Sequence, residues 1–187
     1  MAGSTMYDIH DLCAPSMDVV ARETADTVYL VMRSGFDAVC MHRLEGSFPI
    51  RTLVLEVGSR RPLGVGAGGL AILAAIATAE RGEIIERVSP SLSRFSKMGS
   101  SELIRACRRT DELGYALIKN NVNLGVCAVG QPFRDAMGQP MGALSVAALT
   151  QRMTAERIRG VASLLKNACA DVEQRLRSPR RGGWEVG

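Results

Sequence analysis

The sequence predicts an α+β fold, in which helices flank one six-stranded antiparallel sheet. Three short apolar runs near the start of the chain are joined by brief turns that contain glycine, which is typical of an antiparallel meander. Three more runs of this kind lie in the C-terminal half, again without a helix between neighbours. Helical segments come before, between and after the two groups, so the strands do not alternate with helices as they would in a parallel sheet.

The first half of the chain opens with a helix, expected over residues 8–24, with Pro15 and Ser16 marking a start within it. Runs of β-branched and aliphatic residues then predict three strands, which cover residues 28–32, 38–44 and 50–57. Turns that contain Gly35 and Gly46 separate these strands, so we expect them to pair in order.

Helices fill the middle of the chain. An Ala-rich run over residues 66–79 has helical spacing, and residues 80–88 continue it as a second helix. The side chains that the first of these helices is expected to bury are Leu70, Ile72, Leu73 and Ile76. The Ser-rich residues 89–99 are expected to form a loop, after which Ser100 or Ser101 caps a third helix.

The last third of the chain supplies the second group of strands, over residues 115–119, 125–133 and 141–149. An asparagine-rich turn over residues 120–123 separates the first two. Thr154 is expected to cap a long final helix. The apolar stripe of that helix is Ile158, Val161, Leu165, Ala168, Val172 and Leu176.

Composition limits the classes of function. The 187 residues are 47% hydrophobic, enough for one domain with a packed core, and no run reaches the length of a membrane span. The net charge of +4 is spread along the chain. Arginine clusters in residues 105–109 and 175–181 are interpreted as solvated helix faces, so no nucleic-acid surface is predicted.

Five cysteines and two histidines give no metal site or disulfide framework. No cysteine pair has CxxC spacing, and the histidines lie away from the cysteines. Neither His10 nor His42 stands beside a candidate nucleophile, so no catalytic residues are predicted. We therefore expect a protein of the reducing cytoplasm that has no metal, no cofactor and no enzyme activity.

Glycines mark a candidate binding site. Four of them open the central helical run after the basic corner at residues 59–63, namely Gly64, Gly66, Gly68 and Gly69. Glycines at a helix N-terminus let backbone N–H groups approach an anion. The cluster contains G-x-G-x-x-G, but it lacks the βαβ context of a dinucleotide site, and no Lys-Ser or Lys-Thr follows as in a P-loop. A small anion is the ligand that this turn favours.

Two longer blocks carry a family resemblance. The first comprises ARETADTVYL (residues 21–30), MHRLEG (41–46) and VGSRRPLGVGAGGLAILA (57–74), with a G-S-R-x-P-L corner. The second comprises GYAL (114–117), LGVCAVGQPFRDAMGQPMGALSVAA (124–148) and RMTAERI (152–158). Together they resemble the effector-binding domain of IclR-family transcriptional regulators, over most of the chain from about residue 14 to residue 175.

The resemblance implies a GAF-like fold and a homodimer or tetramer that binds a small metabolite and thereby modulates DNA binding. DNA contact is expected through a winged helix-turn-helix domain, which is absent from this chain. Residues 14–176 are then the effector-binding domain, residues 1–13 an N-terminal arm or remnant of a linker helix, and residues 177–187 a disordered basic tail.

The resemblance also implies a ligand site, at which backbone N–H groups of the small-residue turn meet the oxygens of an acid. The positions that match the family's site are Ile50, Leu53, Ala67, Gly68, Ile118, Val126, Ala128, Ser145 and Ala147. Ile118 stands where an acidic residue is common, Ala147 replaces a serine, and Ala128 replaces a cysteine of some members. An apolar wall requires apolar ligand surface, so an aromatic or aliphatic acid is predicted in place of a two- or three-carbon keto acid.

Two other classes of function stay open on the sequence. One is a GAF-like redox enzyme or sensor that uses the thiol of Cys127 or Cys107. The other is an assembly module whose pocket is vestigial. Reactivity of the thiols would distinguish the first from a ligand sensor, and stabilisation by acids would distinguish the second.

Overall fold

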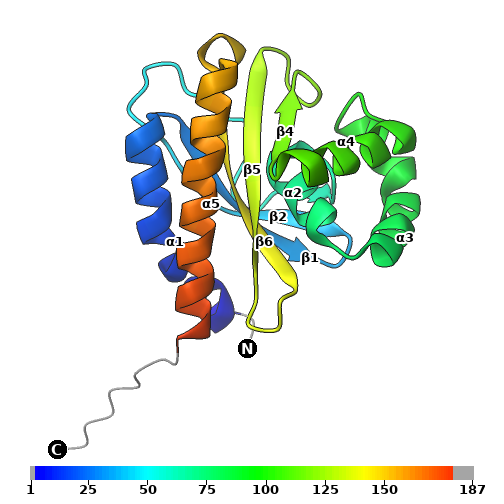
Figure 1. The fold of residues 1–187 in the computed structure, drawn as a ribbon, viewed down its shortest axis with the longest axis horizontal. Helices are drawn as coiled ribbons and strands as arrows, with labels where there is room; N and C mark the ends of the chain where they lie inside the picture. Colours follow the sequence, from blue (N-terminus) through cyan, green and yellow to red (C-terminus); the bar gives the residue numbers. More distant parts are fainter. Residues whose placement is uncertain (1–2, 179–187) are drawn as a thin grey trace, which may run out of the picture.

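A computed structural model describes residues 3–178 (Figure 1). The helices are α1 (Gly3–Thr24), α2 (Gly66–Ala75), α3 (Thr78–Val88), α4 (Ser100–Leu113) and α5 (Ala155–Arg177), with 3₁₀ turns at Ser89–Arg94 and Thr150–Arg152. The strands are β1 (Thr27–Ser34), β2 (Asp37–Leu44), β3 (Arg60–Pro62), β4 (Ala116–Lys119), β5 (Val126–Arg134) and β6 (Pro140–Leu149). The predicted basic tail lies, from residue 179 on, outside the described residues.

The six strands form one sheet in the order β3-β2-β1-β6-β5-β4, and every neighbouring pair is antiparallel. Each group of three strands is a meander, and the pairing of β1 with β6 joins the two groups at the centre. Helices α1 and α5 cover one face of the sheet and α2 the other, with α3 and α4 beyond α2 (Figure 1). The predicted α+β fold with a six-stranded antiparallel sheet is confirmed.

Each face of the sheet has its own core, because successive strand residues point to opposite faces. On β1, Val28 and Leu30 face α1 and α5, whereas Tyr29 and Val31 face α2. The predicted apolar stripe of α5 packs into the first core. The four side chains predicted to be buried by the central helix lie in the second core, and each is at most 2% exposed.

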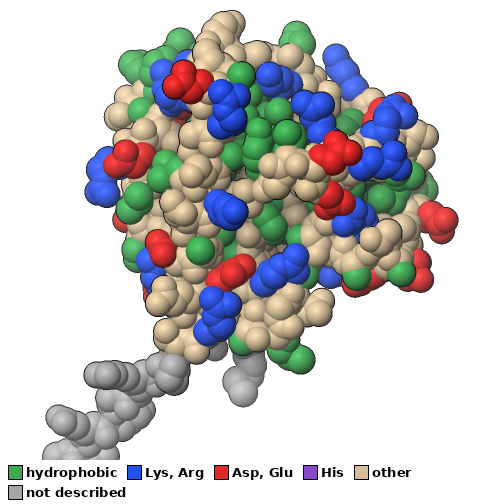
Figure 2. Space-filling view, in the orientation of Figure 1, with side chains coloured by type: hydrophobic (Ala, Val, Ile, Leu, Met, Phe, Trp, Pro, Cys, Tyr) green, Lys and Arg blue, Asp and Glu red, His purple; other side chains and the backbone are tan. Residues whose placement is uncertain are grey.

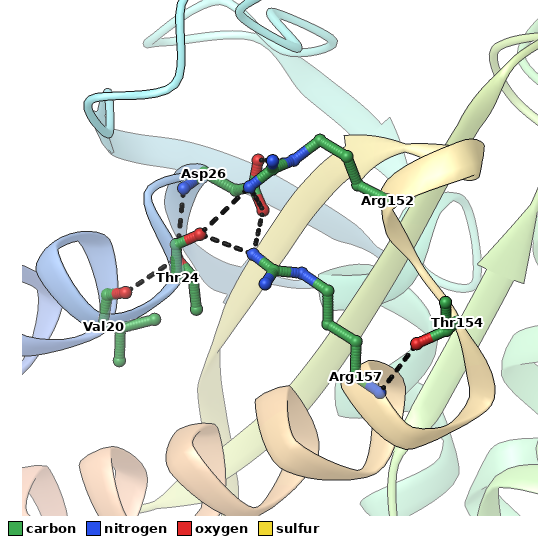
Figure 3. Close-up of polar contacts among 6 residues, drawn as sticks. All are labelled: Val20, Thr24, Asp26, Arg152, Thr154 and Arg157. Atoms are coloured by element: carbon green, nitrogen blue, oxygen red, sulfur yellow. Dashed lines mark hydrogen bonds and ion pairs between the residues drawn. The ribbon is translucent and has the colours of Figure 1, made fainter.

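A buried carboxylate ties the first core together at one edge (Figure 3). Asp26, whose side chain is 3% exposed, accepts hydrogen bonds from Arg152 Nε at 3.2 Å and from Arg157 Nη2 at 2.8 Å. Arg157 also donates to the carbonyl oxygen of Thr24 at the end of α1. Thr154 caps α5 as predicted, since its hydroxyl accepts the N–H of Arg157. This cluster, the Asp26 clamp, joins two segments far apart in the sequence.

The third predicted strand is wrong. Residues 50–57 form no strand, and β3 lies instead at Arg60–Pro62, within the stretch interpreted as a corner. Pro62 pairs with Asp37, so β3 still completes the first meander. We call residues 50–57 the strap, because they cross over one end of the sheet without joining it.

Side chains of β1 and β2 form hydrogen bonds with the backbone of the strap. The hydroxyl of Tyr29 donates to the carbonyl oxygen of Thr52 at 2.7 Å and accepts the N–H of Val54 at 2.8 Å. Arg43 Nη1 donates to the carbonyl oxygen of Leu55 at 3.0 Å. Because these peptide groups are bonded to side chains, they do not enter a strand ladder, although the stretch is rich in β-branched and aliphatic residues.

Three smaller expectations about helix limits are corrected. Gly99, and neither serine after it, is the N-cap of α4, because the carboxylate of Glu102 accepts its N–H at 3.0 Å. Helix α1 continues through Pro15, where no new helix starts. The loop predicted over residues 89–99 contains a 3₁₀ turn at residues 89–94. No helix within residues 3–178 is both long and apolar enough to cross a membrane.

Candidate functional site

A cavity of about 50 Å³ lies between the N-terminus of α2, the strap and the face of the sheet below them. A cavity of this size admits a few atoms the size of water oxygens without any rearrangement. Its lining is Tyr29, Val31, Ala38, Cys40, Val54, Leu55, Ser59, Arg61, Val65, Gly66, Ala67, Gly68, Gly69, Ile118, Val122, Asn123, Val126, Ala128, Ser145 and Ala147.

The first turn of α2 forms one wall of the cavity. Gly66 begins the helix with a φ of 77°, a left-handed conformation that glycine adopts without strain. No residue within 3–178 accepts a hydrogen bond from the N–H of Ala67 or Gly68, as is usual for the first groups of a helix without a side-chain cap. These two donors, which the sequence predicted as the anion-binding turn, lie at the cavity.

Close packing holds this turn against the sheet. A side chain at Gly130 of β5 would collide with the carbonyl oxygen of Ala67. A Cβ at Gly68 would lie 2.6 Å from Val31 Cγ2. Because both glycines are contact points between α2 and the strands, the end of the helix is fixed over the cavity by backbone approach.

Small side chains on the sheet leave the space that α2 covers. Ile118, Ala128 and Ala147 lie side by side across β4, β5 and β6. Ser145 pairs with Tyr29 in the neighbouring row and brings a hydroxyl to the cavity. This floor is apolar apart from the two hydroxyl groups, which limits where a ligand can place polar atoms.

Seven of the nine positions suggested by the resemblance line the cavity, namely Ala67, Gly68, Ile118, Val126, Ala128, Ser145 and Ala147. The other two, Ile50 and Leu53, do not line it; their side chains are on the outside of the strap and are 58% and 46% exposed. Val54 and Leu55 take their place in the wall. The resemblance gave Ile50 and Leu53 by alignment, and their contact with a ligand stays a prediction.

Sequence reasoning also missed Arg61, which reaches the cavity from β3. Its Nη2 donates to the carbonyl oxygen of Val54 at 2.9 Å, and burial lowers the pKa of its guanidinium, against the influence of Cys40 and Tyr29. Arg61 is the unspecified residue of the G-S-R-x-P-L corner, so the motif itself gave no signal. Its pairing opposite Ala38, another lining residue, turns its side chain to the cavity face of the sheet.

The two candidate thiols do not suit redox chemistry. Cys107 and Cys127 are at most 1% exposed, and neither lines the cavity. Burial raises the pKa of Cys107 to about 11, against the opposing influence of Arg81, and burial also raises the pKa of Cys127. The thiolate is the reactive form, and both environments disfavour it near neutral pH.

The described residues hold no candidate metal centre. No group of three or more His, Cys, Asp or Glu side chains between residues 3 and 178 is placed to hold a metal ion. Acidic and basic side chains are interspersed on the face of the molecule that carries α5 (Figure 2). The cavity at α2, where the N–H groups of a helix turn meet an apolar floor, is therefore the candidate binding site.

Comparison with known proteins identifies the kind of domain. Residues 2–174 match the family described as "Bacterial transcriptional regulator IclR C-terminal". The chain is 24% identical over 170 residues to the HTH-type transcriptional regulator KipR of Bacillus subtilis, with 90% of this chain and 68% of KipR covered. It is 25% identical over 172 residues to the HTH-type transcriptional repressor AllR of Escherichia coli, with 90% of this chain and 62% of AllR covered.

Solved structures agree with the fold. The IclR protein of Thermotoga maritima superposes with a TM-score of 0.81 at 25% identity, covering 90% of this chain and 68% of that one. An IclR homologue of Microbacterium hydrocarbonoxydans, solved in complex with 4-hydroxybenzoate, superposes with a TM-score of 0.77 at 20% identity. That match covers 95% of this chain and 71% of the homologue. The chain spans about two thirds of these proteins' length.

Proposed function

The chain belongs to the IclR C-terminal family and is the effector-binding domain of a transcriptional regulator, and we propose that its cavity binds a small organic acid. The single observation that carries this proposal is the first turn of α2. Its unpaired N–H groups at Ala67 and Gly68 face a cavity whose other walls hold no acidic side chain. Such a turn favours a negatively charged ligand group through its N–H donors and the helix dipole.

The floor of the cavity supports an aromatic or aliphatic acid over a short keto acid. Ile118, Val126, Ala128 and Ala147 present only apolar atoms from their side chains. A keto acid of two or three carbons would leave polar atoms against this floor without partners, at a cost of roughly 1 to 3 kcal/mol for each. The 4-hydroxybenzoate complex of the Microbacterium homologue supports the choice, because that ligand combines a carboxylate with an aromatic ring.

Binding of the acid is proposed to act on DNA indirectly. In this proposal the domain forms a homodimer or tetramer, and a DNA-binding domain that is not among the described residues contacts the operator. A ligand that prefers one arrangement of the assembly shifts the population towards it and so changes operator affinity.

A thermal-shift panel tests the ligand class. Benzoate, 4-hydroxybenzoate and hexanoate should raise the melting temperature of the chain, whereas pyruvate and the neutral amides of the three acids, as weaker ligands, should raise it much less at the same concentration. At 100 times its Kd, a ligand of the native state stabilises it by about 2.7 kcal/mol, which is readily measured.

The panel separates the alternatives. If no acid raises the melting temperature, the cavity does not bind acids, and the result favours the alternative of an assembly module. If pyruvate stabilises the chain and the larger acids do not, the apolar part of the proposal is wrong. A bulky residue at Gly68 is a poor probe of the site, since it would also collide with Val31.

A further inference from the structure

The charge of the cavity comes from one side chain. Among the lining residues, Arg61 is the only one that carries a formal charge, and no Asp or Glu lies beside it. A guanidinium stays protonated at any physiological pH. The cavity therefore holds a permanent positive charge, in addition to the partial charge at the N-terminus of α2.

The contacts of Arg61 leave this charge unbalanced within residues 3–178. Its single hydrogen bond goes to a neutral group, the carbonyl oxygen of Val54. Eight other arginines make ion pairs with a carboxylate within 4 Å, including Arg60, which is next to it and pairs with Asp37 at 3.4 Å. Arg61 is partly buried, and its other N–H donors have no acceptor within residues 3–178, so they are open to solvent or to a bound anion.

The two ends of the cavity differ in chemistry. Arg61 belongs to β3 and Ile118 to β4, and these strands are the opposite edges of the sheet. Cys40 and Ser59 lie on the side of β3, whereas Val126 and Ala128 lie beside Ile118. The cavity thus carries its one cationic side chain towards β3, and towards β4 and β5 it is apolar apart from the amide of Asn123. The first turn of α2 lies above it.

We infer that Arg61 is the side-chain anchor for the acid group of the ligand, and that it fixes the ligand's orientation. The carboxylate binds between Arg61 and the first turn of α2, and the hydrocarbon part lies on Ile118, Val126 and Ala128. The ligand class is an amphipathic monocarboxylate, charged at one end only. This inference rests on the proposed function and adds the residue that selects acids over their neutral analogues.

Two neighbouring arginines make a matched test. Arg61→Met removes the charge and retains most of the side-chain length, and Arg60→Met does the same on the solvent side of β3. Arg61→Lys keeps the charge without the planar fork of donors. Isothermal titration of the full 187-residue chain with benzoate, benzamide, hexanoate and hexanamide measures each Kd, and circular dichroism verifies that every variant is folded.

We expect the loss of Arg61 to weaken the binding of the acids and not that of the amides. Arg61→Met should weaken benzoate and hexanoate binding roughly 10- to 100-fold, the effect of a charge-assisted hydrogen bond, and leave the weak binding of the amides unchanged. The affinity of Arg61→Lys for the two acids should lie between those of the wild type and of Arg61→Met. Arg60→Met should bind both acids as the wild type does, because its guanidinium is outside the cavity.

Each contrary result overturns the inference in its own way. If Arg61→Met keeps the wild-type affinity for benzoate, Arg61 is no anchor, although the wild type still binds acids and the proposed function stands. Equal losses in Arg60→Met and Arg61→Met indicate a general electrostatic field. Equal losses for acids and amides in Arg61→Met indicate that the residue only supports the strap through Val54. A wild type that binds neither acid removes the proposed function, and the anchor with it.

Discussion

At the scale of single residues, the site depends on side chains that bind backbone groups far away in the sequence. Tyr29 is 1% exposed, and its hydroxyl both donates to and accepts from the strap. The strap in turn supplies Val54 and Leu55 to the wall of the cavity. One buried hydroxyl therefore couples the stability of the sheet to the shape of the ligand site.

Removal of this hydroxyl tests the coupling. Tyr29→Phe should destabilise the protein by about 1 to 3 kcal/mol, because the N–H of Val54 and the carbonyl of Thr52 lose a partner. Urea unfolding followed by circular dichroism measures the loss, and benzoate titration should show weaker binding as the wall loosens. Tyr115→Phe is the matched control, since the hydroxyl of Tyr115 makes no hydrogen bond within residues 3–178 and its loss should cost little.

At the scale of elements, α1 is placed on the sheet partly by a contact between two histidines. The rings of His10 on α1 and His42 on β2 pack edge to face with centroids 4.1 Å apart. Burial lowers the pKa of His42, the neighbouring His10 lowers it further, and Asp18 opposes them. Packing of α1 on β2 thus favours a neutral His42.

This contact predicts a pH dependence of stability. The pKa of His42 is lower in the folded chain than its usual 6.5, so the unfolded chain binds more protons in the interval just below that value. Stability should then fall as the pH drops from 8 through about 6.5. Urea midpoints at pH 8 and pH 5.5 measure the fall, and His42→Gln should make it smaller. An unchanged fall in that variant would assign the effect to other groups.

At the scale of the whole molecule, the Asp26 clamp closes the fold by joining the end of α1 to the start of α5. Asp26 is 4% exposed and balances two guanidinium groups (Figure 3). The guanidinium carbon of Arg152 also lies 3.6 Å from the centroid of the Phe48 ring. Phe48 precedes the strap, so the clamp also fixes one end of the segment that covers the cavity.

Neutralisation of Asp26 should strongly destabilise the folded protein. Asp26→Asn leaves two guanidinium groups without their carboxylate. The free energy of unfolding is therefore expected to fall by roughly 2 to 4 kcal/mol. Chemical denaturation measures it. Asp37→Asn breaks an exposed pair with Arg60 at 3.4 Å and should cost less than about 1 kcal/mol. Similar losses in the two variants would show that the clamp is no stronger than a surface ion pair.

The sequence by itself determined the structural features that depend on the pattern of neighbouring residues. Apolar periodicity located the helices and five of the six strands, because the faces of helices and strands repeat over a few residues. The glycines of residues 64–69 gave the turn at α2, since the backbone there requires positive φ and close approach. The resemblance of two sequence blocks gave the family and seven residues that line the cavity.

Only the tertiary structure decided which groups meet across the chain. Residues 50–57 have the β-branched and aliphatic composition of a strand, but Tyr29 and Arg43 form hydrogen bonds with their peptide groups. No local pattern records a hydrogen bond to a side chain that is more than ten residues away. Arg60 and Arg61 are adjacent and chemically identical in the sequence. Pairing of β3 with β2 sends the first towards Asp37 and the second into the cavity, because neighbouring residues of a strand face opposite sides of the sheet.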